Sequence, residues 1–420
     1  MNILLIHQNF PGQYKHLGPA LVAQGHTVMA LTLRVKEYGK WQGISVFPYA
    51  VTRGSTKGVH PWLADFETKL LRAEACHDAA VQLRDRKGFY PDVILGHPGW
   101  GEPLFLRDVW PQARLGLYCE LFYRTGEPYT DFDPEFPPVA PGKDALRLRM
   151  KNINNGLHFD IADKGISPTL FQADTFPDPF RKDISVIHDG VNTKLLVPKA
   201  WAVFQVPEGP TLTRNDEVIT FVNRNLEPYR GYHVFMRALP ALLRERPNAQ
   251  VVIVGGDGVS YGSKPPAGQT WKQIYIDEVR GQISDADWAR VHFVGTLPYA
   301  KFVGLLQVSR LHIYLTYPFV LSWSLLETMS VEGTILASDT APVRELIEDG
   351  VTGALVDFFD GAALVARASA LLDDPETSAR LGQAARAHVQ QHYDLETVCL
   401  PRQLAWVSDL AALPPRPLPV

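Results

Sequence analysis

The sequence predicts an α/β protein with two parallel-sheet domains, and three observations carry the prediction. The chain has 420 residues, which suits two domains of about 200 residues each better than one hydrophobic core. In both halves, short apolar runs typical of buried parallel strands alternate with amphipathic helical stretches. A polar stretch punctuated by prolines, at 196–215, separates the two halves.

The composition is that of a soluble globular protein, with 46% hydrophobic and 20% charged residues. The net charge of -4 provides no global basic field, so nucleic-acid binding is not indicated. The three cysteines are widely spaced, which suits a reducing cytoplasm and argues against a disulfide framework. No apolar stretch approaches the ~18 residues of a membrane span. We therefore expect a cytoplasmic chain; a basic stretch from Lys143 to Lys151 is a solvated face or a peripheral contact with a membrane or another anion.

The first half opens with a βαβ unit of Rossmann type. Ile3–Ile6 forms a strand, Gln13–Gln24 a helix, and Thr27–Thr32 the next strand. The loop between the first two lacks GxGxxG, although its one glycine, Gly12, lets the backbone approach a phosphate. The further elements expected in this half are a helix at 63–83, strands at 93–95 and 115–118, a loop at 127–141, a helix at 144–155, and strand ends at 167–169 and 186–190.

The second half repeats this alternation. Its expected elements are strands at 218–222, 251–254, 291–294 and 311–315 and a helix at 232–246. These patterns give a first domain at 1–195, a linker at 196–215, a second domain at 216–400 and a tail at 401–420. Ligands of open parallel sheets bind at the carboxyl ends of the strands, so two facing domains predict a site in the cleft between them.

The segment from Thr316 to Gly353 has the features of an anion site. A helix begins near Ser322, and the free N–H groups of its first turn, which includes Ser324 and Leu325, suit a diphosphate. Glu327, about one turn further, can accept hydrogen bonds from ribose hydroxyls. The alternative is a capping box formed by Ser324 and Glu327, in which the glutamate has no ligand.

This segment resembles the donor-site signature of the retaining GT-B glycosyltransferases of family 4. In that family one Glu precedes Pro-Phe, and a second follows after seven residues. Here Glu327 matches the second, whereas the first position falls on Tyr317 or Phe319, depending on the alignment. The resemblance covers nearly the whole chain. It implies a GT-B fold of two Rossmann-like domains, a tail that crosses back to the first domain, and a sugar site without its first carboxylate.

Two further segments of the second half carry the resemblance. Residues 221–231 are similar to the family's Gly-Arg-Leu-x-Pro-x-Lys-Gly, whose cations neutralise the leaving diphosphate. Arg230 matches the Lys, while Arg224 or Asn225 stands at the Arg position; the alternative is a pair of surface arginines beside a turn. The turn from Gly295 to Leu297 resembles the turn that pairs with the nucleobase.

Candidate residues of the first half follow its strands. His97 comes just after the strand at 93–95, where the family often places a histidine against the transferred sugar. Glu102 and Glu120 are candidates for acceptor contacts. Asp131 and Asp133 have the DxD form of some metal sites, but they lie in a proline-rich loop, so no metal is expected.

The resemblance implies a retaining, metal-independent glycosyltransferase of bacterial type, with His97, Arg230 and Glu327 as its catalytic residues and a nucleotide diphosphate sugar, such as a UDP-sugar or GDP-sugar, as co-substrate. It implies no further cofactor. The acceptor bears a hydroxyl, as in polysaccharide, lipid or metabolite glycosylation, with protein or nucleic acid left open. The alternatives are a GT-B epimerase or phosphorylase, and a nucleotide-sugar-binding protein that does not transfer.

Overall fold

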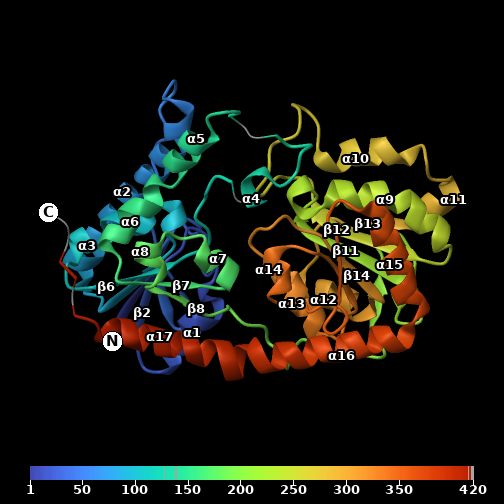
Figure 1. The fold of residues 1–420 in the computed structure, drawn as a ribbon. Helices are drawn as coiled ribbons and strands as arrows, with labels where there is room; N and C mark the ends of the chain where they lie inside the picture. Colours follow the sequence, from blue (N-terminus) through green and yellow to red (C-terminus); the bar gives the residue numbers. More distant parts are fainter. Residues whose placement is uncertain (127, 138–139, 415, 418–420) are drawn as a thin grey trace. The chain divides into compact units, whose positions relative to one another are not determined.

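The computed structural model of the chain describes residues 1–126, 128–137, 140–414 and 416–417 (Figure 1). It has two compact units, and each contains a parallel sheet covered by helices, which confirms the predicted fold class. Unit 1 is Met1–Asp189 with Glu396–Val420, and unit 2 is Gly190–Leu395. Of the predicted loop at 127–141 and tail at 401–420, residues 127, 138, 139, 415 and 418–420 lie outside the described part.

Unit 1 has one eight-stranded sheet, in the order β3-β4-β2-β1-β5-β6-β7-β8. Every pair is parallel except β3 with β4. The strands are β1 Asn2–Ile6, β2 Thr27–Thr32, β3 Gly39–Trp41, β4 Ile44–Pro48, β5 Val93–Gly96, β6 Arg114–Tyr118, β7 Lys164–Ser167 and β8 Ile184–Val186. The helices are α1 Tyr14–Ala23, α2 Pro61–Lys87, α3 Leu106–Val109, α4 Pro128–Asp131, α5 Asp144–Lys151, α6 Ile153–Ile161, α7 Leu170–Asp174, α8 Asp178–Arg181 and α17 Leu400–Ala412.

The apolar runs become strands because both faces of the sheet are covered. Along β1, Leu4 and Ile6 pack into one hydrophobic cluster, with α2, while Ile3 and Leu5 pack into another, with α1 and α17. The close approach of α17 requires a glycine in β6. A Cβ atom on Gly116 would lie 2.7 Å from side-chain atoms of both Trp406 and Leu410.

Unit 2 has a six-stranded parallel sheet, in the order β13-β12-β11-β14-β15-β16, and a separate antiparallel pair, β9 with β10. The strands are β9 Val203–Gln205, β10 Thr211–Thr213, β11 Val218–Asn225, β12 Gln250–Gly256, β13 Val291–Phe293, β14 Leu311–Tyr314, β15 Ile335–Ser338 and β16 Ala354–Val356. The helices are α9 Tyr232–Glu245, α10 Trp271–Arg280, α11 Asp285–Trp288, α12 Tyr299–Val308, α13 Trp323–Ser330, α14 Ala341–Arg344, α15 Gly361–Asp373 and α16 Pro375–His392.

The sequence-based prediction missed three features. The division between the units falls at Asp189 and Gly190, so the predicted linker at 196–215 lies inside unit 2 and contains β9 and β10. Strands β3 and β4 were not predicted; they are short and joined by a tight turn at Gly43. The helix predicted at 144–155 is two helices, α5 and α6. They meet at Asn152, whose side chain bonds the backbone of Tyr123.

In each sheet, successive strands are first added on one side of the initial strand and then on its other side, so the strand order reverses at one place. In unit 1 this place is between β1 and β5, and in unit 2 it is between β11 and β14. Loops that leave the carboxyl ends of two such strands part to opposite sides and leave room for a ligand. The residues after these four strands are therefore the first to consider as functional.

Unit 2 buries a polar group beside this point. His312 of β14 is fully buried, and its Nδ1 lies 2.9 Å from Thr220 Oγ1 of β11, which in turn lies 2.8 Å from Ser309 Oγ. Burial lowers the pKa of His312 from 6.5 to about 3, so the folded protein keeps this ring neutral.

Acid should destabilise unit 2 through this histidine. Below pH 6.5 this histidine is protonated in the unfolded chain, whereas in the folded chain it stays neutral until the pH approaches its pKa of about 3. Its contribution to stability is therefore complete above pH 6.5 and decreases as the pH falls from 6.5 to about 3. At about pH 5 the loss is roughly 2 kcal/mol from this group. Urea unfolding at several pH values measures it. The His312→Leu variant should lose less stability on acidification, and an equal loss in both proteins would contradict this assignment.

No helix in the described part of the chain combines the length and the apolar character that a membrane span needs.

Candidate functional site

Arg230 lies at the reversal point of the unit 2 sheet. It ends a short 3₁₀ turn, Pro228–Arg230, in the loop after β11, and Gly231 with φ +68° turns the chain into α9. The guanidinium donates from Nη1 to Thr316 Oγ1 at 2.8 Å, and Thr316 follows β14. The loops after the two central strands thus meet at this arginine.

The charge of Arg230 is buried without a matching anion. The residue is 5% exposed, and its guanidinium carbon lies 5.0 Å from the ring centre of Tyr261 and 5.9 Å from that of Phe319. Among the described residues, no carboxylate is paired with it. A buried guanidinium with aromatic neighbours and no carboxylate suits an anionic ligand such as a phosphate.

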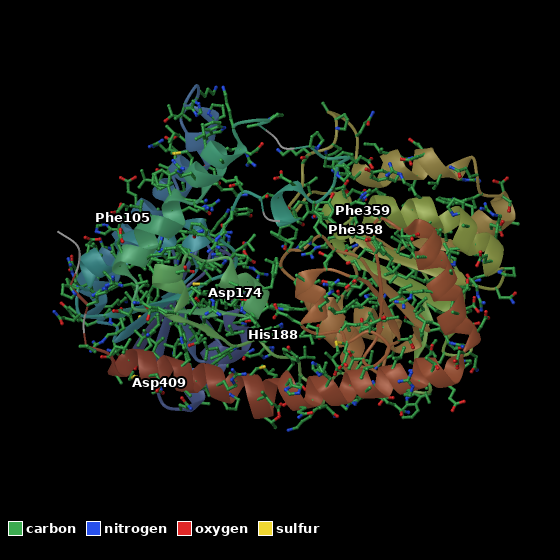
Figure 2. The ribbon with its side chains drawn as sticks, in the orientation of Figure 1. Phe105, Asp174, His188, Phe358, Phe359 and Asp409 are labelled. Atoms are coloured by element: carbon green, nitrogen blue, oxygen red, sulfur yellow. The ribbon has the colours of Figure 1, made fainter. Side chains whose placement is uncertain are left out.

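Both candidates for the first Glu position belong to an aromatic cluster. Tyr317 and Phe319 are each 4% exposed, and their ring centres lie 4.5 Å and 5.1 Å from that of Tyr229. Phe358 packs at 5.3 Å on Tyr317, and Figure 2 shows Phe358 beside Phe359 after β16. Under either alignment, an aromatic ring therefore stands where a carboxylate would be expected.

Arg224 and Asn225, at the end of β11, have different environments. The Arg224 side chain is exposed. Asn225 donates from Nδ2 to Ser260 Oγ at 2.7 Å and accepts the Gly258 N–H at 3.2 Å. Asn225 thus holds the glycine-rich loop after β12, and of the two residues Arg224 is the cation.

Glu227 is a residue of this site that the sequence-based reasoning missed. It is 1% exposed, and its carboxylate accepts the backbone N–H groups of Ser260, Tyr261 and Gly262 at 3.1–3.2 Å. These bonds fix the loop that places the Tyr261 ring over Arg230. The feature of the sequence that could have indicated Glu227 is an acidic residue beside a proline in a loop that is otherwise basic.

The start of α13 is capped by Ser322. Its Oγ accepts the Ser324 N–H at 3.4 Å, and its own N–H donates to Tyr314 Oη at 2.8 Å. Burial raises the pKa of Tyr314, while the charge of Arg230 and the Ser322 N–H oppose this rise. Arg230 therefore lies near the α13 start. Leu325 is fully buried in the core, so its backbone is the part that can face a ligand.

The capping-box alternative for Glu327 is wrong. Because Ser322 is the cap, Ser324 is already inside the helix and Glu327 lies too far along it to close such a box. The Glu327 carboxylate instead accepts the Tyr299 hydroxyl at 2.8 Å through Oε1. Tyr299 begins α12 just after Leu297, so the predicted ribose and nucleobase residues belong to neighbouring elements.

His97 follows β5 at the reversal point of the unit 1 sheet. Its Nδ1 accepts the Gly99 N–H at 3.0 Å, so Nε2 is the ring nitrogen that can donate a hydrogen bond. The ring stacks on Trp100 with centres 4.2 Å apart. Its Nε2 lies 3.3 Å from Oε2 of Glu120, which follows β6. The structure thus brings two predicted residues, His97 and Glu120, together.

His7, which follows β1, repeats this arrangement and was not predicted. Its Nδ1 accepts the Asn9 N–H at 3.0 Å, and its ring meets the same Trp100 edge to face at 4.5 Å. Burial, with the neighbouring His97, lowers the pKa of His7 to about 4, so the ring is neutral at pH 7. Both histidines can therefore donate a hydrogen bond from Nε2.

The His7 ring leaves no room for a side chain at Gly12. The φ of Gly12 is +48°, and a Cβ atom there would lie 2.0 Å from His7 Nε2 and 2.3 Å from Cε1. We expect Gly12→Ala to displace the imidazole and to lower the stability of the chain by about 1–3 kcal/mol. Thermal unfolding measures the loss. Gly25→Ala is the control, since Gly25 has φ +84° but no neighbour within 4 Å of the added atom. Equal losses in the two variants would contradict a specific contact with His7.

Two other predicted residues have hydrogen-bond partners outside these groups. Glu102 is 1% exposed and accepts the Tyr49 hydroxyl at 2.7 Å, and burial raises its pKa, so it is a packed residue of the core. Asp133 accepts the Glu135 N–H at 2.9 Å in a local turn. In the basic stretch, Lys143 and Arg149 are exposed, whereas Arg147 pairs with Asp144 and burial lowers the pKa of Lys151 to about 8.

Two family models match the chain. The model described as "Glycosyl transferase family 4 group" matches residues 24–196, and the model described as "Glycosyl transferases group 1" matches residues 207–388. The first match lies almost entirely in unit 1 and the second lies in unit 2.

Curated relatives include D-inositol 3-phosphate glycosyltransferases. The protein from Streptomyces avermitilis is 29% identical over 249 residues, 54% of this chain and 48% of that protein. The protein from Mycolicibacterium vanbaalenii is 27% identical over 333 residues, 76% of this chain and 66% of that protein. The chain spans about half the length of the first of these relatives.

Solved structures share the fold. Sucrose-phosphate synthase from Thermosynechococcus elongatus has a TM-score of 0.74 at 18% identity over 98% of this chain and 100% of that one. HepE from Anabaena, solved with UDP and glucose, has a TM-score of 0.65 at 17% identity over 97% of this chain and 99% of that one. Matches over both units, and this fold, show that the chain belongs to the family 4 glycosyltransferases of the GT-B fold.

Proposed function

We propose that the protein transfers a sugar from a nucleoside diphosphate sugar to a hydroxyl group, with retention of anomeric configuration and without a metal ion. The observation that carries the proposal is the buried, unneutralised Arg230 beside the start of α13 at the reversal point of the unit 2 sheet. Structural neighbours solved with UDP and with UDP-glucose support a uridine donor.

The donor diphosphate would lie against Arg230 and the first-turn N–H groups of α13. Both offer positive charge at fixed positions, so they stabilise the charge that develops on the departing diphosphate. Arg224, exposed in the same loop, adds a second cation. Glu327 would bind ribose hydroxyls, with Tyr299 orienting one of its oxygens, and the Leu297 turn would hold the base.

Unit 1 carries groups that suit the hydroxyls of an acceptor. His97 and His7 each present an Nε2–H, and the Glu120 carboxylate lies beside His97. N–H donors and one carboxylate suit hydroxyl groups, which donate and accept hydrogen bonds at once. An acceptor with several hydroxyls, such as a sugar or cyclitol, fits these groups, and curated relatives named for an inositol phosphate support that class.

A second candidate function is nucleotide-sugar binding without transfer. The observation that favours it is the buried aromatic pair, Tyr317 and Phe319, at the position of the family's first Glu. Without that carboxylate the sugar would lose hydrogen bonds that help to align it for reaction.

Release of nucleoside diphosphate from UDP-, GDP- and ADP-sugars, with a panel of polyol acceptors and with water alone, tests the proposal. Transfer predicts nucleotide release that persists in EDTA, and a product whose anomeric proton coupling matches that of the donor. Binding without release would favour the second candidate. A product of opposite anomeric configuration, or activity that needs Mn²⁺, would overturn the proposed mechanism.

A further inference from the structure

The loop between β12 and α10, at 257–270, is anchored to the loop after β11 by two side chains. The Glu227 carboxylate accepts three successive backbone N–H groups, those of 260–262. Asn225 bonds both a side chain and a backbone N–H of the same loop. Loops that join a strand to a helix are usually the mobile parts of a fold. These bonds hold this one in place, and they fix the position of Tyr261 within it.

Tyr261 is the accessible aromatic ring at Arg230. Two rings lie near the Arg230 guanidinium, those of Tyr261 and Phe319. Phe319 is buried, whereas Tyr261 is 39% exposed. The two ring centres lie 5.0 Å apart, so Tyr261 continues the buried aromatic cluster outward. A ligand whose phosphate is bound by Arg230 can therefore also contact the Tyr261 ring.

Tyr261 lies on the side of the site away from the residues that suit a nucleoside. Figure 1 shows α9 and α10 on one side of the unit 2 sheet and α12 and α13 on the other. Glu327 and Tyr299 belong to α13 and α12. Arg230 stands where the two sides part, and the loop with Tyr261 leads into α10. Because a diphosphate joins the nucleoside to the sugar, a nucleoside beside α12 and α13 places the sugar beyond the phosphates, toward Tyr261.

We propose that Tyr261 binds the transferred sugar by stacking its ring against the C–H groups of one face of the sugar. The inference rests on the proposed function and adds to it the residue that contacts the sugar. A pyranose ring is apolar on its faces and polar around its edge, and aromatic side chains are common apolar walls of ligand pockets. Contact with an anchored ring would thus hold the sugar where Tyr317 or Phe319 stands in place of a carboxylate.

Isothermal titration of the full chain with UDP and with UDP-glucose tests this role, because the two ligands differ by the sugar. Tyr261→Leu should weaken the binding of UDP-glucose about three- to tenfold and change that of UDP by less than about twofold. Leucine still covers Arg230 with an apolar side chain but has no ring face. Tyr261→Phe keeps the ring and should bind both ligands as the unmodified protein does.

Saturation-transfer difference NMR gives a second readout that a purely structural role would not change. With saturation of the aromatic protons of the protein, the glucose protons of UDP-glucose should receive less saturation in Tyr261→Leu, relative to the uracil protons, than in the unmodified protein. The matched control is Trp201→Leu, which removes an aromatic side chain that is 79% exposed just before β9 in the same unit. It should leave both affinities and the saturation pattern unchanged.

Three results would overturn the proposal. Equal weakening of UDP and UDP-glucose by Tyr261→Leu would mean that the ring serves the phosphate or the base instead of the sugar. Unchanged UDP-glucose affinity in Tyr261→Leu would mean that the ring does not contact the sugar. Binding of UDP without binding of UDP-glucose to the unmodified protein would overturn this inference alone, whereas failure to bind either ligand would overturn the proposed function as well.

Discussion

Arg230→Met should weaken the binding of UDP by roughly 30- to 150-fold, which corresponds to ~2–3 kcal/mol for a hydrogen-bonded charge. The guanidinium is 5% exposed and is bonded to Thr316, so it is positioned before the ligand arrives. Methionine keeps most of the packing against Tyr261 and Phe319 but cannot bind a phosphate. If transfer occurs, turnover should fall by about 10²–10³, since a fixed donor to developing negative charge is lost. Isothermal titration with UDP and steady-state kinetics measure the two effects.

Two comparisons separate a phosphate contact from a structural role. Arg344→Met is the matched control, because Arg344 belongs to the same unit but is exposed and paired with Asp339. It should leave UDP affinity unchanged. Arg230→Lys keeps the charge but loses the planar fork, so its affinity should lie between those of Arg230→Met and the unmodified protein. Equal UDP affinity in Arg230→Met and the unmodified protein would contradict the proposed site.

Glu327→Ala should raise the donor KM and lower kcat/KM by about 10- to 100-fold, because a carboxylate that accepts two ribose hydroxyls supplies ~1.5–3 kcal/mol. Tyr299→Phe removes the phenol that bonds Oε1, and we expect a smaller change of about threefold in KM, since the carboxylate remains. Initial rates over a range of donor concentrations give both values.

Glu332→Gln is the control for this pair. Glu332 lies just past the end of α13 and is partly exposed, and its Oε1 lies 3.9 Å from Nε of Arg386. The variant therefore tests whether the loss of any carboxylate near this helix changes the donor KM. Its KM should equal that of the unmodified protein. A Glu327→Ala variant that loses thermal stability but keeps its donor KM would show a structural role for the carboxylate instead.

The central strands could be predicted from the sequence because they are buried on both faces. Runs such as Ile3–Ile6 and Val251–Val254 are continuous and apolar, and the structure places each inside a sheet, between two other strands. The division between the units could not be predicted in the same way. The best signal for a boundary was the run of prolines and polar residues at 196–215. That run instead contains a small antiparallel pair, whose strands are too short for their alternation of inward and outward side chains to be recognised in the sequence.

The candidate site shows the same division between local and long-range information. Arg230 and Glu327 stand in recognisable local patterns, and the structure gives each a defined partner, Thr316 and Tyr299. The role of Glu227 rests on backbone N–H groups more than thirty residues away, at 260–262. The contact of both His7 and His97 with Trp100 rests on the adjacency of β1 and β5. Neither contact has a local pattern, so topology was needed to find them.

Hydrogen exchange of the full chain with and without UDP tests the central claim, that a nucleotide diphosphate binds between the β11 loop and the start of α13. We predict slower exchange in peptides covering 223–231 and 316–328 when UDP is present, and no change at 339–349, where Arg344 and Asp339 form an exposed ion pair. Protection confined to other parts of the chain, or unchanged exchange throughout at saturating UDP, would contradict the assignment.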